Sequence, residues 1–345
     1  MVVGQPGEMM SSIKISNKYI GKSFPTYFIA EAGLNHNGDI NLAKKMIDEA
    51  KNANSDAIKF QTYKSENFLT ENSKYFDFFK NVELSFEEFK EIKEYADNVG
   101  ITFLSTPFDF ESADYLKKID VPGFKIASSD VTNLPLIAHI AKMKLPIILS
   151  TGLATLDEID ESIKLCHSLR NDQISILHCV ADYPAMPEET NLSAMETIRE
   201  KFCCPVGYSD NGESSLVDEV AVSMGADIIE KHFTLDKKLE GPDHSFSIQP
   251  DDLKLLISRI RLIEKIRGNG IKIPSNSEIK NKLAIRKSIF ASQLILKGDI
   301  FSSKNLAIKR PGDGIEPKHW NDLINKKSTR DINKDELIIW DDFSK

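Results

Sequence analysis

Residues 123–152, GFKIASSDVTNLPLIAHIAKMKLPIILSTG, contain one complete structural repeat of the chain. The stretch begins with the apolar run GFKIASSD at 123–130 and ends with the run PIILSTG at 146–152. The segment between the two runs has the pattern of a helix. Short apolar runs that alternate with helices are typical of parallel strands buried on both faces. The stretch therefore predicts an α/β fold.

The same repeat recurs from Thr26 to about Gly268, and it gives eight apolar runs in all. The other six runs are TYFIAEAG (26–33), AIKFQTY (57–63), TFLSTPF (102–108), ISILHCV (174–180), PVGYSD (205–210) and DIIEKHFT (227–234). One of the intervening helices is predicted over 39–53, with Asp39 as its cap. Eight strand–helix units in about 240 residues predict a (β/α)8 TIM barrel. An open doubly wound sheet is the alternative, but the units lack a glycine-rich nucleotide loop, which favours the closed barrel.

The pattern changes after the barrel, so we divide the chain into four parts. Residues 1–25 are predicted to be an N-terminal tail and lead-in with a loose MVVGQPG start, and residues 26–267 the barrel. Residues 268–284 are rich in Gly, Pro, Asn and Ser and predict a linker. Residues 285–345 contain short β-like runs around two turn sequences, KGD and NKD. They predict a small, mostly β domain.

The composition excludes several classes of protein. The chain of 345 residues has 44 Lys and Arg against 52 Asp and Glu, with 41% apolar and 28% charged residues, which suits a soluble globular protein. The net charge of −8 gives no electrostatic reason to expect a nucleic-acid partner. The sequence shows no apolar run of 18 residues and no signal-peptide layout at its start. Its four cysteines follow neither disulfide nor zinc spacing, so we expect a cytoplasmic protein.

Polar residues stand at the ends of the apolar runs. Barrel enzymes place their working groups where strands end and the following loops begin. Because the strands of a closed barrel are otherwise apolar, each polar side chain there needs a partner or a ligand. These residues are Glu31, Lys59, Gln61, Thr106, Lys125, Ser128, Ser150, His178, Ser209, Asp210, Glu230 and His232.

Two lysines lie inside apolar runs, Lys59 in AIKFQ and Lys125 in FKIAS, where a solvated surface position does not fit their neighbours. Together with nearby Ser and Thr hydroxyls, two ammonium groups would form a compact anion site, most simply for a phosphate ester. The alternative is a buried ion pair with Glu31 or Glu230. His232 shares strand parity with Glu230, so both face the same side of their strand. A histidine at this rim is a candidate metal ligand, against the alternative of a satisfied core residue.

Several motifs, in order along the chain, resemble the sialic acid (N-acetylneuraminate) synthase family. They are IAEAGLNHNGD from Ile29, IKFQTY from Ile58, STPF from Ser105, FKIASSD from Phe124, ILSTG from Ile148, LHCVADYP from Leu177, GYSD from Gly207, IEKHFTLDK from Ile229 and GPDH from Gly241. KRPGDG from Lys309 resembles the family's C-terminal antifreeze-like (SAF) domain. The resemblance runs from about residue 26 to the C-terminus. It implies a TIM barrel followed by a SAF domain.

The resemblance implies a reaction and a set of roles. The family condenses phosphoenolpyruvate with an N-acetylmannosamine-type sugar to give a nonulosonic acid and phosphate. Phosphoenolpyruvate would be held by Lys59, Thr106, Lys125, Ser128, Ser150 and Ser209, and the sugar or reacting centre would be surrounded by Glu31, Gln61, Asp130, Tyr183 and Asp243. Glu31 is the candidate general base. Arg310 would reach the sugar's N-acyl group across a dimer interface, which implies a domain-swapped homodimer.

The resemblance also implies a divalent cation, Mn²⁺ or Mg²⁺, because the aldehyde oxygen gains negative charge as the carbon–carbon bond forms. His232 matches one of the family's two metal-binding histidines, but Asn211 stands where the other is typical. Its neutral amide oxygen is a weaker ligand for manganese. Asp210, His36 or His244 are alternatives that would compensate.

Two further departures concern the sugar. Asp130 stands where many relatives have glutamate, and Ala181 where sialic acid synthases can have asparagine. They leave open a diacetamido-trideoxy hexose, as for legionaminate or pseudaminate, or a phosphorylated sugar. Two rival functions remain. One is another phosphoenolpyruvate-dependent barrel that takes a phosphorylated aldose, and the other is a catalytically inert carbohydrate-binding protein.

Overall fold

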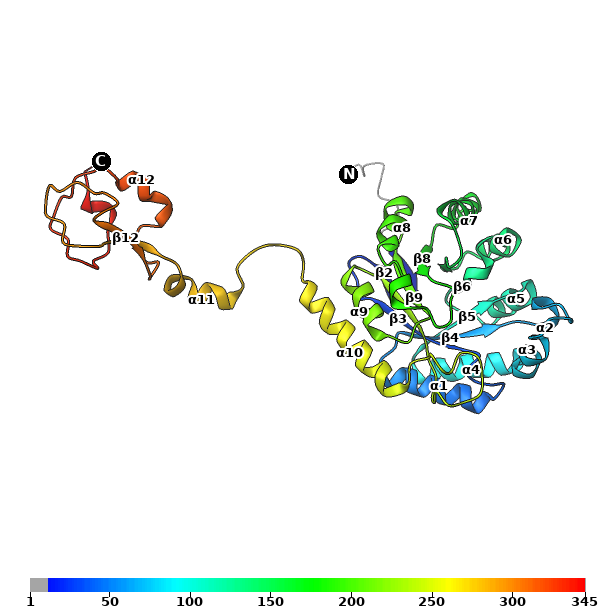
Figure 1. Cartoon of the computed structure of the whole chain (residues 1–345). Coiled ribbons are helices and arrows are strands. Elements are labelled where there is room, and N and C mark those ends of the chain that lie inside the picture. The colour runs from blue at the N-terminus through cyan, green and yellow to red at the C-terminus, as the bar shows by residue number, and fades with distance from the viewer. Residues whose placement is uncertain (1–11, 345) are drawn as a thin grey trace. The chain divides into compact units, whose positions relative to one another are not determined.

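Figure 1 shows the computed structural model of the chain, which describes residues 12–344. The chain separates into two compact units between Gly268 and Asn269, and each unit has its own hydrophobic core. Within the described residues, no helix combines the length and the apolar composition needed to cross a membrane.

The first unit is a barrel of eight parallel strands. The strands are β3 (Tyr27–Gly33), β4 (Ala57–Thr62), β5 (Thr102–Pro107), β6 (Phe124–Ile126), β7 (Ile147–Ser150), β8 (Ile174–Cys179), β9 (Val206–Asp210) and β10 (Ile228–His232). Their order is β5-β4-β3-β10-β9-β8-β7-β6, so the first and last strands of the repeat pair with each other, and β5 lies in contact with β6. Each predicted run contains one of these strands, which confirms the predicted TIM barrel.

Helices surround the barrel (Figure 1). Those that follow the eight strands are α1 (Ile40–Asn52), α4 (Phe86–Val99), α5 (Phe110–Lys118), α6 (Leu134–Lys142), α7 (Leu156–Ser168), α8 (Ala194–Phe202), α9 (Ser215–Ser223) and α10 (Pro250–Arg267). Two short helices, α2 (Ser65–Phe68) and α3 (Phe76–Val82), lie in the connection between β4 and α4. Short 3-10 turns, η1 (Ser128–Asp130) and η2 (Pro187–Glu189), lie in the connections after β6 and β8.

Side-chain caps fix where several helices begin. Asp39 accepts a hydrogen bond from the backbone nitrogen of Asn41 at 2.8 Å, which confirms it as the cap of α1. Ser85 and Glu88 form a capping box at the start of α4. Each cap satisfies backbone N–H groups that the first helical turn leaves without partners. The helices therefore start at sequence-defined positions, which fixes the lengths of the strand-end loops.

A hairpin closes the amino-terminal end of the barrel. Strands β1 (Ser12–Ile15) and β2 (Lys18–Gly21) pair antiparallel, and Ile13, Ile15 and Ile20 pack in one buried cluster with barrel residues. The sequence analysis predicted a tail and lead-in over residues 1–25 and did not predict this hairpin. The signal was the alternation of apolar and polar residues on both sides of Ser16, which has a left-handed φ of 52°. The predicted loose MVVGQPG start lies outside the described residues.

Inside the barrel, alternate residues along each strand point to the centre. The lower layer is apolar and packs with the hairpin; it contains Tyr27, Ile29, Ala57, Leu104, Ile148, Leu177 and Ile228. Gly207 is required at the same level, because a Cβ atom there would lie 2.2 Å from the carbonyl oxygen of Ile228. Since side chains alternate with a period of two, the next inward residue of each strand lies above this layer, toward the carboxyl ends.

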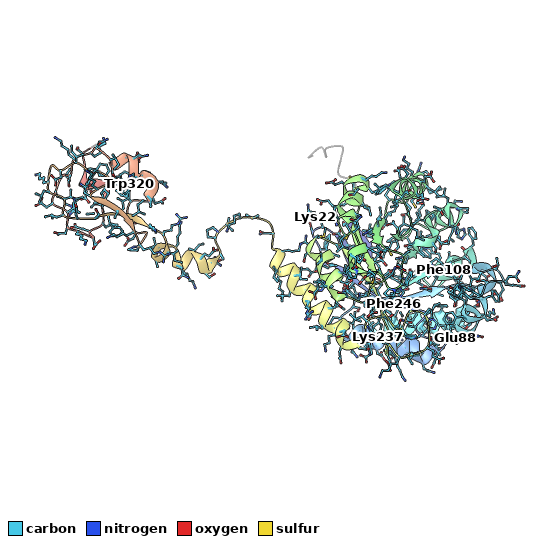
Figure 2. All side chains as sticks on the ribbon, in the orientation of Figure 1. Lys22, Glu88, Phe108, Lys237, Phe246 and Trp320 are labelled. Carbon is cyan, nitrogen blue, oxygen red and sulfur yellow. The ribbon has the colours of Figure 1, made fainter. Side chains whose placement is uncertain are left out.

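The second unit contains the antiparallel strands β11 (Ser288–Ala291) and β12 (Leu306–Lys309), with short helical pieces η3 (Pro317–His319), α12 (Trp320–Leu323) and η4 (Trp340–Asp342). Its core contains Ile289, Ala291, Ile295, Phe301, Leu306, Ile315, Leu323, Ile332 and Ile338, with Trp320 packed against it (Figure 2). The predicted linker 268–284 overlaps a helix, α11 (Asn276–Ile285), which Ser275 and Glu278 start with a capping box.

Candidate active site

Polar side chains from the barrel strands and the loops after them meet in one pocket of about 330 Å³. It is lined by Glu31, Lys59, Gln61, Thr106, Phe108, Lys125, Ala127, Ser128, Ser129, Ser150, Leu153, Cys179, Ala181, Tyr183, Ser209, Asn211, Glu230 and His232. Most of the residues predicted from the strand ends are in this set. The pocket lies above the apolar layer, so the barrel itself positions its floor.

Lys59 is buried and ion-paired. Its Nζ lies 2.7 Å from Oε2 of Glu31 and 3.8 Å from Oε1 of Glu230, and it donates to Oγ1 of Thr106 at 3.1 Å. Burial opposes the charged form of Lys59, but Glu230 and Glu31 outweigh burial and raise its pKa. Burial raises the pKa of the Glu31 carboxyl, and Lys59 opposes that rise. Lys59 is thus held as a cation beside a carboxyl group that is easier to protonate than an ordinary glutamate.

Lys125 is equally buried but less well compensated. Its Nζ lies 3.6 Å from Oε1 of Glu230 and donates to the carbonyl oxygen of Ile126 at 3.2 Å. Burial lowers the pKa of Lys125, and Glu230 opposes this effect. The sequence left two alternatives for these lysines, an anion site and a buried ion pair. Each lysine is ion-paired, and each also lines the pocket, as an anion site requires. Two ammonium groups therefore converge on one cavity.

The hydroxyl groups in the pocket differ in whether they have a hydrogen-bond partner. Ser150 Oγ is buried and has no hydrogen-bond partner among residues 12–344. Ser209 Oγ donates to Oε1 of Glu230 at 3.1 Å, and Ser128 Oγ accepts from the backbone nitrogen of Gly152 at 2.9 Å. A buried hydroxyl without a partner is costly unless a ligand completes it. Ser150 therefore marks a place where an anion's oxygen atoms fit.

The upper rim of the pocket collects groups suited to a polyol. Gln61 Nε2 donates to Oε1 of Glu31 at 3.2 Å, and Tyr183 lies edge-on to His232 with ring centroids 6.0 Å apart. Asp243 Oδ2 lies 3.7 Å from Nδ1 of His232. A Cβ atom on Gly33 would contact Gln61, Glu31 and Asp243 within 3.6 Å, so these three side chains surround one backbone position.

His232 and Asn211 line the same pocket, as a shared metal site requires. Nδ1 of His232 is buried and lacks a hydrogen-bond partner in the described part of the chain. The side-chain NH₂ of Asn211 donates to the carbonyl oxygen of Val180 at 2.7 Å, which leaves its amide oxygen for a cation. Between residues 12 and 344, no three His, Cys, Asp or Glu side chains are grouped as metal ligands. These residues fit a weakly held cation that takes its other ligands from substrate or water.

The proposed substitutes for the missing histidine are engaged elsewhere. Asp210 is ion-paired with Lys231, and His244 contacts Oγ1 of Thr234 at 2.7 Å. His36 accepts from the backbone nitrogen of Gly38 at 3.1 Å, and burial lowers its pKa to about 4. None of the three lines the pocket.

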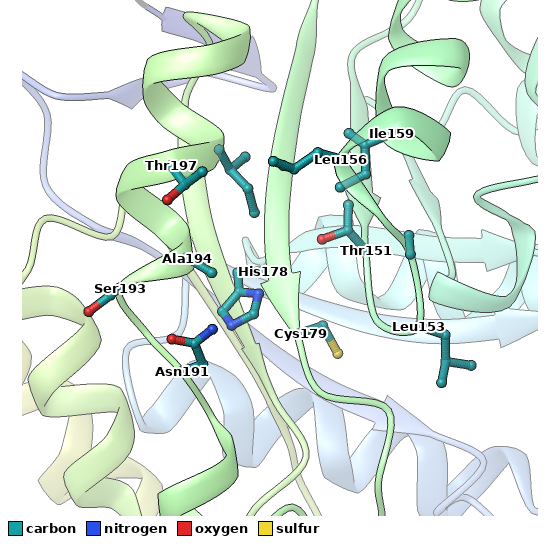
Figure 3. Close-up of a pocket in the computed structure, with 12 residues that line it drawn as sticks. Thr151, Leu153, Leu156, Ile159, His178, Cys179, Asn191, Ser193, Ala194 and Thr197 are labelled. Atoms are coloured by element: carbon teal, nitrogen blue, oxygen red, sulfur yellow. The ribbon is translucent and has the colours of Figure 1, made fainter.

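Strand parity separates the polar strand-end residues into two groups. His178 and Asp210 have the opposite parity to the pocket residues and lie outside the barrel wall. Figure 3 shows His178 on the side of its strand that faces Asn191 and Ala194, whereas Cys179 points toward Leu153. His178 Nε2 lies 2.7 Å from the carbonyl oxygen of Thr190, so its role is structural. Both residues lie at strand ends, which is why they were predicted at the site, but their side chains point to the outer face of the barrel.

Besides Asp243, which lies beside His232 at the rim, two predicted sugar-binding residues do not line the pocket. Asp130 accepts a hydrogen bond from Nδ2 of Asn133 at 2.8 Å, and Asn133 in turn caps α6. Arg310 belongs to the second unit, where it is exposed directly after β12. The predicted roles of both residues at the sugar stay predictions.

Some pocket residues were missed. Cys179 lies two residues after Leu177 on β8, so both side chains point into the barrel. Counting alternate residues along the strand would therefore have predicted Cys179. Ser129 lies in the turn η1, which follows β6 directly. Phe108 comes one residue after β5, and its ring lies 4.6 Å from that of Phe68. Apolar loop residues of this kind carry no signal in the sequence that separates them from core residues.

A buried ionic cluster supports the strand-end loop that carries Asn211. Lys231 Nζ is ion-paired with Asp210, lies 3.1 Å from Oδ2 of Asp218 and donates to the carbonyl oxygen of Gly212 at 3.0 Å. Burial raises the pKa of Asp218 well above its usual range; Lys231 opposes this rise and Asp210 adds to it. Two carboxylates that share one ammonium group cannot both ionise cheaply, so the raised pKa favours the protonated form of Asp218.

The chain matches the model of the NeuB family over residues 46–272 and that of the SAF domain over residues 286–344. It therefore belongs to the NeuB family, as its motifs implied. It is 48% identical to an uncharacterized protein of Methanocaldococcus jannaschii, covering 96% of this chain and 99% of that protein. It is 43% identical to the N,N'-diacetyllegionaminic acid synthase of Campylobacter jejuni, covering 91% and 98%.

Among solved structures, the chain is similar to the N-acetylneuraminic acid synthetase of Leptospira borgpetersenii. The TM-score is 0.76 at 40% identity, and the match covers 80% of this chain and 96% of that one. The chain is an enzyme of the acid synthase type. The alternative of an inert carbohydrate-binding protein is not supported.

Proposed function

We propose that the chain condenses phosphoenolpyruvate with an N-acylated aldose to give a nonulosonic acid and phosphate. The observation that carries this proposal is the convergence of Lys59 and Lys125 on one pocket beside the unpartnered hydroxyl of Ser150. A phosphate ester with two or more negative charges is the ligand that such a group suits. The products in the names of the synthase relatives, N,N'-diacetyllegionaminic acid and N-acetylneuraminic acid, support the same class of reaction.

In this proposal, the lysines and hydroxyls hold phosphoenolpyruvate by its phosphate and carboxylate. C3 of phosphoenolpyruvate then forms a bond to the aldehyde carbon of the open-chain sugar, and water adds at C2. The C2–O bond to phosphate breaks, phosphate leaves, and C2 becomes a ketone. The added water loses two protons: one is balanced by the proton that the aldehyde oxygen takes up, and the other leaves with the phosphate.

Glu31 is the group we assign to the proton from water. It lines the pocket, and burial raises the pKa of its carboxyl above the usual value. A base with a raised pKa accepts a proton more readily at neutral pH than an ordinary carboxylate.

We propose that His232 and Asn211 hold a divalent cation, Mn²⁺ or Mg²⁺. When bound, such an ion stabilises negative charge on the sugar's aldehyde oxygen. His232 supplies an imidazole nitrogen, and Asn211 supplies a neutral oxygen that binds manganese weakly. Gln61, Tyr183 and Asp243 orient the sugar next to this position.

The sugar is the finer question. A second candidate is a diacetamido-trideoxy hexose in place of an N-acetylmannosamine-type sugar, and the named relative from Campylobacter jejuni favours it. To test the function, the protein is supplied with phosphoenolpyruvate, divalent metal and a panel of N-acylated hexoses. We expect phosphate release that depends on the aldehyde. No release with any sugar and metal would remove the proposal.

We propose a homodimer in which Arg310 of each copy reaches the N-acyl group in its partner's barrel. Mixing Lys59→Met with Arg310→Ala, each inactive alone, tests this. A mixed dimer has one site with both changes and one with neither, so equal mixing restores about a quarter of wild-type activity. If Arg310 acts within its own chain, mixing the two variants yields no recovery. If Arg310 has no role at the sugar, Arg310→Ala alone keeps its activity.

Replacing Asn211 with His should tighten manganese binding, because an imidazole nitrogen is a stronger ligand than an amide oxygen for this ion. Titration of Mn²⁺ by calorimetry or paramagnetic relaxation measures the change. Asn211→Ala is the matched control and should weaken the binding. An unchanged manganese affinity in both variants would show that the metal is held elsewhere.

A further inference from the structure

Asp243 and His232 face each other at the rim of the reaction pocket, and neither side chain has its full set of partners. Oδ2 of Asp243 lies 3.7 Å from Nδ1 of His232, which is too far for a hydrogen bond. Nδ1 of His232 is buried and has no hydrogen-bond partner among residues 12–344. In the same part of the chain, His232 is the only group within ion-pair distance of the Asp243 carboxylate. A buried nitrogen and a carboxylate left in this way are costly unless a ligand completes both.

The separation of these two atoms suits two ligands of one divalent cation. Metal–nitrogen and metal–oxygen bonds are about 2.0–2.2 Å long, so two ligand atoms of one ion lie about 3–4 Å apart. The side chains of His232 and Asp243 are only 11% and 18% exposed, so bulk water screens the pair little. A carboxylate at this position supplies the negative charge that the neutral amide of Asn211 lacks.

His244, the residue after Asp243, locks two strand-end loops together. Its side chain is fully buried. Nδ1 of His244 lies 2.7 Å from Oγ1 of Thr234 in its own loop, and its Nε2 lies 3.3 Å from Oδ1 of Asn37 in the loop after β3. Nδ2 of Asn37 in turn donates to the carbonyl oxygen of Glu240 at 2.9 Å. Asn37 therefore binds the loop after β10 on both sides of Asp243.

Two further contacts fix the backbone around Asp243. Oγ of Ser247 donates to the carbonyl oxygen of Asp243 at 2.6 Å and accepts from Nδ2 of Asn35 at 3.0 Å. Gly241 has a positive φ of 150°, and a Cβ atom there would lie 2.7 Å from Cδ2 of His244, so this close approach requires glycine. The motifs IAEAGLNHNGD and GPDH thus form one interlocked pair of loops.

The position of Asp243 is also open to an ion and its water ligands. Asp243 lines a neighbouring cavity of about 1060 Å³, whose wall includes residues of α2 and α3. A cation can therefore reach Oδ2 of Asp243 from this space, and Oδ1 remains for the sugar.

We propose that Asp243 is a ligand of the divalent cation, together with His232 and Asn211, and that Asn37 and His244 are positioning residues that hold its carboxylate at the ion. This inference rests on the proposed function, because the cation is part of that proposal. The chain then holds its ion with one imidazole nitrogen and two oxygen atoms, and Asp243 compensates for the histidine that Asn211 replaces.

Titration of the protein with Mn²⁺, followed by electron paramagnetic resonance without phosphoenolpyruvate or sugar, tests the ligand. We expect Asp243→Asn to weaken Mn²⁺ binding by roughly 100-fold, since even the loss of a residue that only supports a ligand costs about 10–100-fold. Glu240→Gln removes the same charge from an exposed position of the same loop and should leave the Mn²⁺ affinity unchanged.

An unchanged Mn²⁺ affinity in Asp243→Asn, or an equal loss in Asp243→Asn and Glu240→Gln, would overturn the inference. Aldehyde-dependent phosphate release by the wild-type protein would still support the proposed function in that case. If the wild-type protein bound no Mn²⁺, the inference and the proposed metal would both fail, whereas no phosphate release with any sugar and metal would remove the reaction itself.

A double-mutant cycle tests the positioning. His244→Phe keeps a ring but removes both hydrogen-bonding nitrogens, and it should weaken Mn²⁺ binding by roughly tenfold. In the Asp243→Asn background the same change should cost less than about twofold, because its effect passes through the Asp243 carboxylate. Asn37→Leu cuts the same link from the other loop and should repeat this pattern, which keeps the test open if His244→Phe does not fold. Equal losses in both backgrounds would show that these residues do not position Asp243.

Discussion

Replacing Lys125 with Met is expected to abolish phosphoenolpyruvate binding and, at the same time, to leave the protein as stable as before or more so. The loss of a charge-assisted contact to a partly desolvated phosphate costs about 3 kcal/mol, or more than about 100-fold in affinity. Stability should not fall, because burial already lowers the pKa of Lys125, and Glu230 keeps a second cation in Lys59. Active sites commonly hold such destabilising groups.

Lys59→Met should lose the same affinity but also lose stability. Its ammonium group lies 2.7 Å from the buried carboxylate of Glu31, and removing one partner of a buried pair costs about 3 kcal/mol or more. Calorimetry with phosphoenolpyruvate and denaturant unfolding measure the two effects separately. Lys90→Met, at an exposed position on α4, is the control. Equal unfolding free energies for the two pocket variants would show that the pairing of Glu31 with Lys59 does not stabilise the fold.

Replacing Lys231 with Met is expected to have the largest effect on stability, about 3–5 kcal/mol, because it leaves the buried carboxylate of Asp210 without its cation. Asp218→Asn should change the free energy of unfolding by less than about 1 kcal/mol, since Asn has the shape of the protonated carboxyl that burial favours at this position. The two substitutions thus separate a paired carboxylate from a neutral carboxyl group in the same cluster.

Denaturant unfolding at neutral pH measures both variants. A large loss for Asp218→Asn would mean that Asp218 is ionised and that Lys231 is shared by two carboxylates. Because Lys231 also donates to the carbonyl oxygen of Gly212, its loss should loosen the loop that carries Asn211. Weaker metal binding in the folded fraction would accompany the loss of stability.

The strands of the barrel were predictable from the sequence because parallel strands buried on both faces read as apolar runs. The same runs made the pocket predictable. A lysine such as Lys59, which lies between apolar neighbours, cannot face solvent and therefore indicates a buried polar site. Parity along each strand, applied consistently, would also have placed Cys179 inside and His178 outside. This part of the site follows from local sequence alone.

Other parts of the site depend on contacts between distant segments. Glu31 and Lys59 meet because β3 and β4 are neighbours in the sheet, and their register places the two residues side by side. The hairpin β1–β2 was missed because its eight strand residues form two short runs, whose isoleucines are buried against the distant residues of the barrel floor. The cavity wall formed by α2 and α3 was missed because, in the sequence, its aromatic residues cannot be distinguished from ordinary core residues.

The hairpin at the bottom of the barrel has a kinetic consequence. Ile13, Ile15 and Ile20 fill that end, so we expect substrates to reach the pocket from the opposite end of the barrel. Lys59 and Lys125 lie deeper in the pocket than Gln61 and Tyr183. A sugar that binds first would therefore block access to the two lysines. For the proposed reaction we therefore expect an ordered sequence of binding, with the phosphorylated three-carbon acid first and the sugar second.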